Sequence, residues 1–234
     1  MLKLTTFSIA ARCSRTGQLG VAVSTKVPGV GGICPFIAPG VGAVATQAWV
    51  NPYIGVRVLA ALQKGMPAAE ALQTVMVDEI DRELRQVGVV DARGRSESFT
   101  GKSTDPWTGH RNGPEYAIQG NMLVGEDTVL AMERAFLDAA AEPLGERLML
   151  AIEAGQHAGG DKRGRQSASV KVFADEDYPI VDLRADEHPD PVAELRRIFE
   201  VAKRELFPFI DVLPTKKNPK GNLDSIRAAM GPKD

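Results

Sequence analysis

The order of the predicted strands and helices constrains the fold of this chain more than any other feature. Strand-like runs come in groups, and pairs of amphipathic helical segments separate the first groups. Elements arranged in blocks, rather than alternating singly, argue against a βαβ winding and favour an α+β fold. Two sheets stacked face to face, each covered by a pair of helices, accommodate this order.

Turn residues and helix caps set the expected boundaries of these elements. Residues 15–18 supply a hairpin turn, Asn51-Pro52 opens a helix with a favourable cap, and Gly65 ends it. We expect strands at 3–12, 18–26, 41–48, 86–91, 96–100, 116–120, 167–174 and 180–184. We expect helices at 52–65, from 67 through 76, at 126–139, at 143–157 and from 190 through 199, loops at 27–40 and 101–114, and a final helical turn at 226–230.

Composition and charge narrow the class of protein. A chain of 234 residues with 44% apolar content can bury one substantial core, which we place at 1–204, followed by a partly basic extension at 205–234. A net charge of −2 argues against a general nucleic-acid binder, and no apolar run approaches the roughly 18 residues of a membrane span. The start lacks the apolar region of a signal peptide, so we expect a cytoplasmic protein.

The segment 159–167, Gly-Gly-Asp-Lys-Arg-Gly-Arg-Gln-Ser, is the strongest candidate for binding chemistry. It holds three cations and one carboxylate between glycines that let the backbone turn tightly. Guanidinium groups in a cleft suit a planar carboxylate or phosphate. We expect Arg165 to face such a cleft and Arg163 to pair with an acidic residue. The alternative is a solvated basic loop held by a salt bridge from Asp161.

Polar residues at the ends of predicted strands form a second group of candidates. Lys26 ends one strand, Gln47 and Asn51 lie at a strand-to-helix turn, and Gln119-Gly120-Asn121 lies at the end of another strand. Amides at such positions either cap an element or bind a substrate carbonyl. His110 is the histidine with the best prospect of lining a site, because it lies in a polar loop beside Trp107 and Arg111.

Three familiar motifs are absent or incomplete. Residues 100–103 read Thr-Gly-Lys-Ser, like the end of a phosphate-binding loop, but Ser96 stands where the first glycine of that loop is required. The three histidines are far apart and have no partners at zinc-ligand spacing, and two cysteines show no metal pattern. A Gly-x-Ser-x-Gly nucleophile elbow is missing. We therefore expect no metal and no cofactor.

Five segments carry a family resemblance. Residues 6–9, 20–23, 40–47, 119–121 and 159–167 resemble an uncharacterised bacterial and archaeal family assigned to the N-terminal-nucleophile (Ntn) hydrolase-like, proteasome-type fold. The resemblance covers about residues 4–200 and implies a four-layer αββα sandwich. Some members of that family carry a C-terminal segment described as a peptidoglycan-binding module, and residues 205–234 resemble a remnant of one.

The resemblance also implies a chemistry. Ntn hydrolases use a Thr, Ser or Cys at a free N-terminus, whose own α-amine is the base. Here the hydroxyl of Thr6 could act in this way only after cleavage between Thr5 and Thr6. Lys26 would tune the nucleophile or stabilise developing charge. The residues expected to bind the substrate amide and its carboxylate are Gln47, Asn51, Asn121, Asp161, Arg163, Arg165 and Gln166.

Two functions remain open at this point. The first is an Ntn-type amidohydrolase for a small amide or peptide-like substrate that bears a carboxylate. The second is a non-catalytic anion-binding or assembly protein with the same fold. We also expect a homodimer, because Trp49, Tyr53 and the segment 33–37 are more apolar than solvated loops require. That segment could instead fold over a sheet edge.

Overall fold

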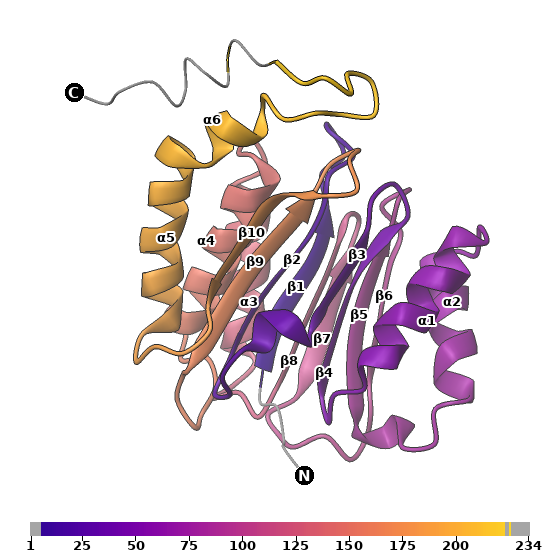
Figure 1. Cartoon of the computed structure of the whole chain (residues 1–234). Helices are drawn as coiled ribbons and strands as arrows, with labels where there is room; N and C mark the ends of the chain where they lie inside the picture. The colour runs from indigo at the N-terminus through magenta and orange to yellow at the C-terminus, as the bar shows by residue number, and fades with distance from the viewer. Residues whose placement is uncertain (1–5, 223–224, 226–234) are drawn as a thin grey trace.

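Two antiparallel sheets form the centre of the molecule (Figure 1). The structure is a computed structural model and describes residues 6–222 and residue 225. The six-stranded sheet has the order β10-β9-β2-β1-β8-β7 and the four-stranded sheet the order β3-β4-β5-β6. The strands are β1 Thr6–Arg12, β2 Leu19–Thr25, β3 Pro35–Ala38, β4 Gly42–Ala48, β5 Arg85–Asp91, β6 Ser96–Thr100, β7 Gly109–Gly113, β8 Tyr116–Asn121, β9 Ser167–Phe173 and β10 Pro179–Ala185.

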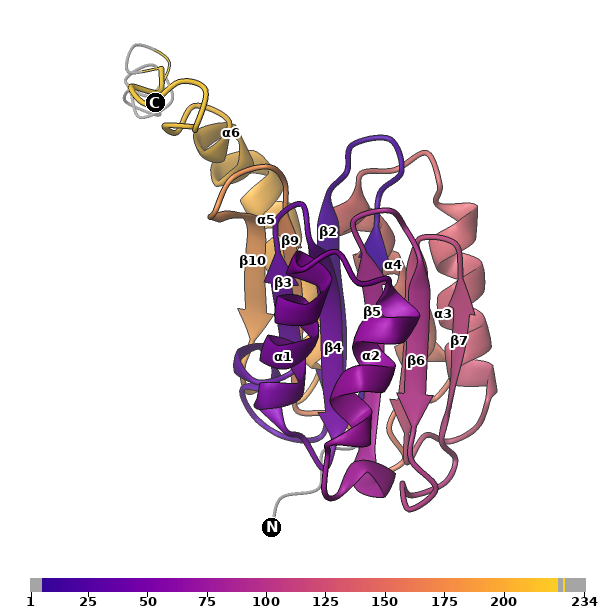
Figure 2. The ribbon, with the colours of Figure 1, turned by 90° about the vertical axis from the view of Figure 1, so that its right-hand side faces the viewer.

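Helices cover the outer face of each sheet (Figures 1 and 2). Helices α1 and α2 contact strands of the four-stranded sheet, whereas α3, α4 and α5 contact strands of the six-stranded sheet. The helices are α1 Pro52–Gln63, α2 Ala68–Val77, α3 Asp127–Asp138, α4 Leu144–His157, α5 Pro191–Glu205 and the short α6 Phe207–Ile210. The fold is therefore α+β with two antiparallel sheets, as the block order predicted, but three helices rather than the expected pair contact the six-stranded sheet. No helix among the described residues is long and apolar enough to cross a membrane.

Successive side chains of a strand point to opposite faces of its sheet, and the two faces pack into different clusters. In β1, Phe7 and Ile9 belong to the apolar cluster with the helices on the six-stranded sheet, whereas Ala10 packs with residues of the other sheet. Part of the space between the sheets is apolar and includes Val21, Val23, Val30, Cys34, Ala43, Ala45 and Val90. Another part contains buried hydroxyls and amides instead, and this polar region holds the candidate site.

The structure corrects two of the predicted loops. The segment 27–40 contains a short 3₁₀ helix, Val30–Gly32, and strand β3, while 101–114 contains strand β7. Both missed strands lie at sheet edges; β3 has only four residues and begins with proline, and β7 consists of glycine and polar residues, so their own pattern is weak. Their pairing with β4 and β8 comes from tertiary context. The helical turn expected at 226–230 lies outside the described residues.

Candidate functional site

Thr6 is the first residue of β1 and lies between two polar neighbours. In the sheet register it pairs with Thr25 of β2 on one side and Asn121 of β8 on the other. All three residues are buried, and Thr6 Oγ1 donates a hydrogen bond to Thr25 Oγ1 at 3.1 Å. These residues meet because the N-terminal end of β1 lies beside the C-terminal ends of its antiparallel neighbours, β2 and β8. Two hydroxyls and an amide are thus adjacent in the interior.

Gln47 reaches this group from the opposite sheet. Its Nε2 donates to the carbonyl oxygen of Thr6 at 3.2 Å and to Gln86 Oε1 at 2.8 Å. Its Oε1 accepts a hydrogen bond from Ser8 Oγ at 2.6 Å. Gln47 is fully buried, so these bonds replace those that water would otherwise make. The Gln47 amide therefore holds the backbone of Thr6 against β4.

Gln86 is the centre of the buried network. Its Oε1 accepts hydrogen bonds from Gln47 Nε2 and from Asn121 Nδ2, the latter at 3.0 Å. Its Nε2 lies within donating distance of Gly120 O at 2.9 Å and Gly109 O at 3.1 Å. Gln86 thus connects the four-stranded sheet to β7 and β8 and sets which atom of the Asn121 amide faces it.

The prediction from sequence missed Gln86 and Ser8, whereas it placed Gln119 among the candidate amides at strand ends. Gln119 Nε2 donates to Ser8 Oγ at 2.6 Å, which closes the network around Gln47. A signal for these residues does exist. Ser8 and Gln119 alternate with apolar residues of their strands, and Gln86 opens an apolar run, so each is a polar residue at a position that points into the core.

The segment 159–167 joins this end of the sheet. Residues 160 and 162 hydrogen-bond to the backbone just after β8: Val124 N–H donates to Gly160 O, and Lys162 N–H to Met122 O. The positive φ angles of Gly159 and Gly160, 113° and 59°, allow the turn that brings the segment there.

Asp161 is the buried charge of the site. Its carboxylate accepts hydrogen bonds from the backbone N–H of Lys26 at 3.1 Å and of Arg163 at 2.9 Å. The Arg163 guanidinium forms an ion pair with it at 3.3 Å. Burial raises the pKa of Asp161 above its ordinary value, although the bonds from Arg163 and Lys26 act in the opposite direction. Because Lys26 follows Thr25, this carboxylate is tied to the strand beside Thr6.

The two arginines of the segment have different partners. Arg163 pairs with Asp161, whereas Arg165 pairs with Asp190 at 3.1 Å and lines a pocket of about 250 Å³ with Glu153, Gln156 and His157. Lys26 is exposed, and its ammonium donates to Arg165 O at 3.3 Å. Gln166 N–H donates to Thr25 O. Each of these three cations therefore has a partner within the protein.

Asn51 and His110 lie farther out. Asn51 caps α1 by accepting from Tyr53 N–H at 3.1 Å and donates to Glu79, so both polar atoms of its side chain are engaged. His110 Nδ1 lies 2.9 Å from Thr100 Oγ1, which in turn lies 3.0 Å from Gln86 Nε2. His110 is thus connected to the network, and Asn51 is not brought to Thr6 by a described hydrogen bond.

Solved structures include close and distant matches to this fold. The crystal structure of a protein of the DUF1028 family from Silicibacter pomeroyi matches with a TM-score of 0.85 and 28% identity, over 93% of this chain and 98% of that chain. Anbu, the ancestral beta-subunit from Yersinia bercovieri, has a TM-score of 0.40 and 13% identity over 86% of this chain and 96% of that chain. Anbu from Hyphomicrobium sp. strain MC1 has a TM-score of 0.38 and 11% identity, with the same coverage.

The sequence comparisons assign a family. No curated protein shows significant sequence similarity to the chain. The model described as a family of unknown function, DUF1028, matches residues 6–195, and so spans the polar network from Thr6 through Asp161 and Gln166. The chain therefore belongs to the DUF1028 family.

Proposed function

We propose that this chain is an amidohydrolase of the N-terminal-nucleophile type, built on a four-layer αββα arrangement, and that Thr6 is its nucleophile. The observation that carries the proposal is the placement of Thr6. It begins the central strand β1, its hydroxyl is bonded to Thr25, and the Gln47 amide holds its carbonyl group. A nucleophile needs such fixed geometry, because misplacement of the reacting atom lowers the rate steeply.

The proposed chemistry requires a free α-amine on Thr6, which hydrolysis of the Thr5–Thr6 peptide bond would release. The amine then takes the hydroxyl proton while Oγ1 forms a bond to the carbonyl carbon of the substrate amide. The tetrahedral intermediate breaks its C–N bond, and the leaving amine takes the proton from the Thr6 ammonium. Water next hydrolyses the acyl ester and regenerates Thr6. Thr25 would hold Oγ1 in place through these steps.

The surrounding side chains have proposed roles that follow from their contacts. The amides of Gln47 and Asn121 would orient the reacting groups, and the ammonium of Lys26 would stabilise developing negative charge. Arg163 would attract a substrate carboxylate. Arg165 would do the same once that carboxylate replaces its present partner, Asp190. Asp161 would hold the backbone of Lys26 and Arg163. Asn51 and Gln166 support the local backbone in this scheme.

The cleavage experiment tests the proposal directly. The full-length protein is purified, incubated and measured by intact mass and N-terminal sequencing, beside Thr6→Ala and Thr6→Ser variants. We expect the wild type and Thr6→Ser to lose Met1 to Thr5 and Thr6→Ala to keep them. Loss of the segment from Thr6→Ala as well would mean that another protease removes it. An unchanged wild-type mass would contradict the proposal and favour the non-catalytic anion-binding or assembly protein.

The substrate class needs a second measurement. The processed protein is assayed with paired chromogenic amides that differ only in a carboxylate or its methyl ester. We expect faster hydrolysis of the acid, and Arg163→Gln should reduce this preference, because a neutral amide cannot replace the guanidinium. Equal rates for acid and ester would contradict the carboxylate requirement while leaving the nucleophile proposal intact.

A further inference from the structure

A second pocket lies at the end of the six-stranded sheet opposite to Thr6. It has a volume of about 600 Å³, and its lining includes Gln18, Ala174 and Ile180. Gln18 precedes Leu19, which pairs with Phe173 in the register, whereas Thr25 pairs with Ser167 at the other end of the same two strands. Strands of this length span about 20 Å. The pocket is therefore separate from the site around Thr6.

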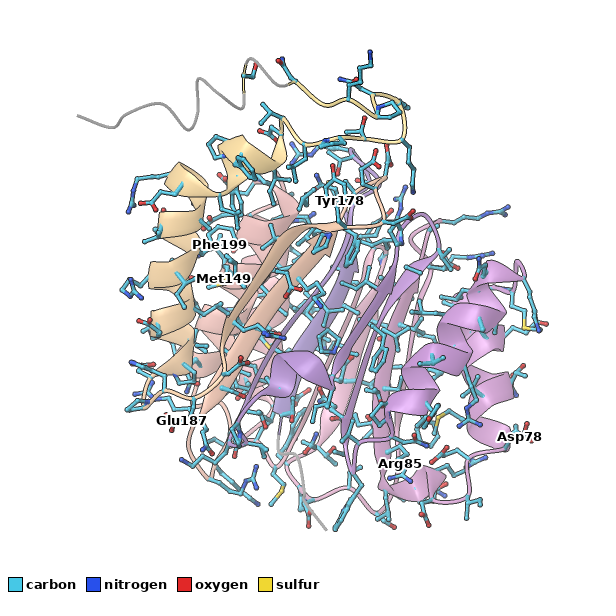
Figure 3. All side chains as sticks on the ribbon, viewed as in Figure 1. Asp78, Arg85, Met149, Tyr178, Glu187 and Phe199 are labelled. Atoms are coloured by element: carbon cyan, nitrogen blue, oxygen red, sulfur yellow. The ribbon has the colours of Figure 1, made fainter. Side chains whose placement is uncertain are left out.

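The large apolar side chains of the pocket lining come from three elements. Strand β10 contributes Ile180 and Val181, α5 contributes Phe199, and α6 contributes Phe207 and Ile210. Figure 3 labels Phe199, and its ring meets that of Phe207 edge-on with centroids 5.6 Å apart. The volume lies in the range of pockets that enclose small molecules. An apolar body would thus find a preformed enclosure.

The positive and negative side chains that line the pocket differ in whether they already have an ionic partner. The ammonium of Lys203 is bonded to Glu146 at 2.6 Å and to Glu200 at 3.1 Å. The carboxylates of Glu142 and Asp211 also line the pocket, and neither forms an ion pair with the described part of the chain. The charge left for a ligand is therefore negative.

Aromatic rings in the pocket already accept a cation. Lys203 Nζ lies 5.1 Å from the centroid of the Phe199 ring, a distance at which the ring face attracts positive charge. Phe207 adds a second ring to the wall. The rings and the carboxylates of Glu142 and Asp211 favour the same kind of ligand, since both interact best with a positive group.

We propose that this pocket binds a small organic cation, namely an apolar or aromatic body that carries a protonated amine. The apolar walls would bury the body, and Glu142 and Asp211 would pair with the ammonium. An anion of the same size would be repelled by these carboxylates. A neutral analogue would bury the same area without the charge interaction, so it would bind more weakly than the amine.

Three matched compounds test this proposal on the full-length protein. We choose 4-phenylbutylamine, 4-phenylbutanol and 4-phenylbutyrate at neutral pH, with binding measured by calorimetry. The amine should bind about threefold to tenfold more tightly than the alcohol, and the acid should bind most weakly. Equal binding of the three compounds, tighter binding of the acid, or no binding of the amine at millimolar concentration would overturn the proposal.

Variants locate the binding within the pocket. The double variant E142Q/D211N should bind the amine and the alcohol alike, whereas Glu205→Gln, an exposed carboxylate on α5 outside the lining, should retain the preference for the amine. Ala174→Trp and Ile210→Trp fill the pocket from a loop and from α6, and each should abolish binding while the variant keeps a cooperative melting transition. Undiminished affinity in both filled and folded variants would also overturn the proposal.

Discussion

Gln119 Oε1 lies directly over Gly88, and a Cβ added to that glycine would be 1.9 Å from it. The two residues come from different sheets, β8 and β5, so this contact limits how closely the sheets approach in the polar region. Gln119 in turn donates to Ser8, which donates to Gln47. The glycine at position 88 thus makes room for the network that surrounds Thr6.

Gly88→Ala should therefore destabilise the protein by about 1–3 kcal/mol, because the Gln119 amide must move away from its bond to Ser8. Urea unfolding measures the change. Gly32→Ala is the matched control, since an added Cβ there meets no atom within 4 Å. In a Gln119→Ala background the cost of Gly88→Ala should shrink. An equal cost in both backgrounds would contradict the assigned contact.

Gln86→Met should cost about 2–4 kcal/mol of unfolding free energy, because it leaves the buried amide of Asn121 and the carbonyls of Gly109 and Gly120 without their partner. Methionine has a similar length, so the change removes hydrogen bonds more than volume. The control is Gln73→Met on an exposed position of α2, which should change stability little. Comparable effects of the two variants would contradict the central role of Gln86.

Glu79 should contribute a pH-dependent part of the stability. Burial alone would raise its pKa, but hydrogen bonds from Asn51, Arg85 and Arg57 outweigh burial and lower the pKa below its usual 4.5. A carboxyl group with a lowered pKa in the folded state stabilises the protein above its ordinary pKa, and this stabilisation is lost as the pH falls through the folded value.

The measurement compares wild type with Glu79→Gln by urea unfolding from about pH 7 down to about pH 3. The wild type should be more stable near neutrality, and the difference should narrow as the pH drops below about 4.5. Arg85, one of the partners, is labelled in Figure 3 at the end of the four-stranded sheet. A difference that stays constant over the whole range would contradict the lowered pKa.

Asp161 should have the opposite effect on the pH dependence of stability from Glu79. Burial raises its pKa above the usual 3.8, so the folded state holds a proton more readily than the unfolded state. As the pH falls through the interval between the raised value and 3.8, the wild type should gain stability relative to Asp161→Asn. Unfolding curves of both proteins over this interval check the slope. A slope in the other direction would mean that Arg163 dominates over burial.

The homodimer remains a prediction, and the exposed apolar side chains of helix α1 are the surface through which we expect the two chains to meet. Tyr53 is 72% exposed and Val56 is 51% exposed, while Cys34 of the segment 33–37 is buried. One chain has a mass of 25.1 kDa, and we expect light scattering at micromolar concentration to return about twice that mass. Tyr53→Glu should lower the mass to that of one chain, whereas Val124→Glu, an exposed apolar residue elsewhere, should not. A wild-type mass near 25 kDa would contradict the dimer.

Sequence patterns predicted most strands of the two sheets because those strands are long and apolar. The runs at 18–26, 41–48 and 167–174 correspond to β2, β4 and β9, and the cap at Asn51-Pro52 corresponds to the start of α1. These signals are local, since periodicity and capping depend on residues within a few positions. Strands β3 and β7 lack such a signal and are ordered by the strands beside them.

The sequence by itself determined the α+β class, the order of the elements apart from β3 and β7, and the cation-rich segment 159–167, because each depends on neighbouring residues. Only the tertiary structure decided which polar side chains meet. Ser8 and Gln47 are 39 positions apart, and Ser8 and Gln119 are 111 apart, yet all three are bonded in one buried network. Contacts of this kind depend on how one sheet stacks on the other, since a buried amide must find its partner wherever the fold brings one within reach.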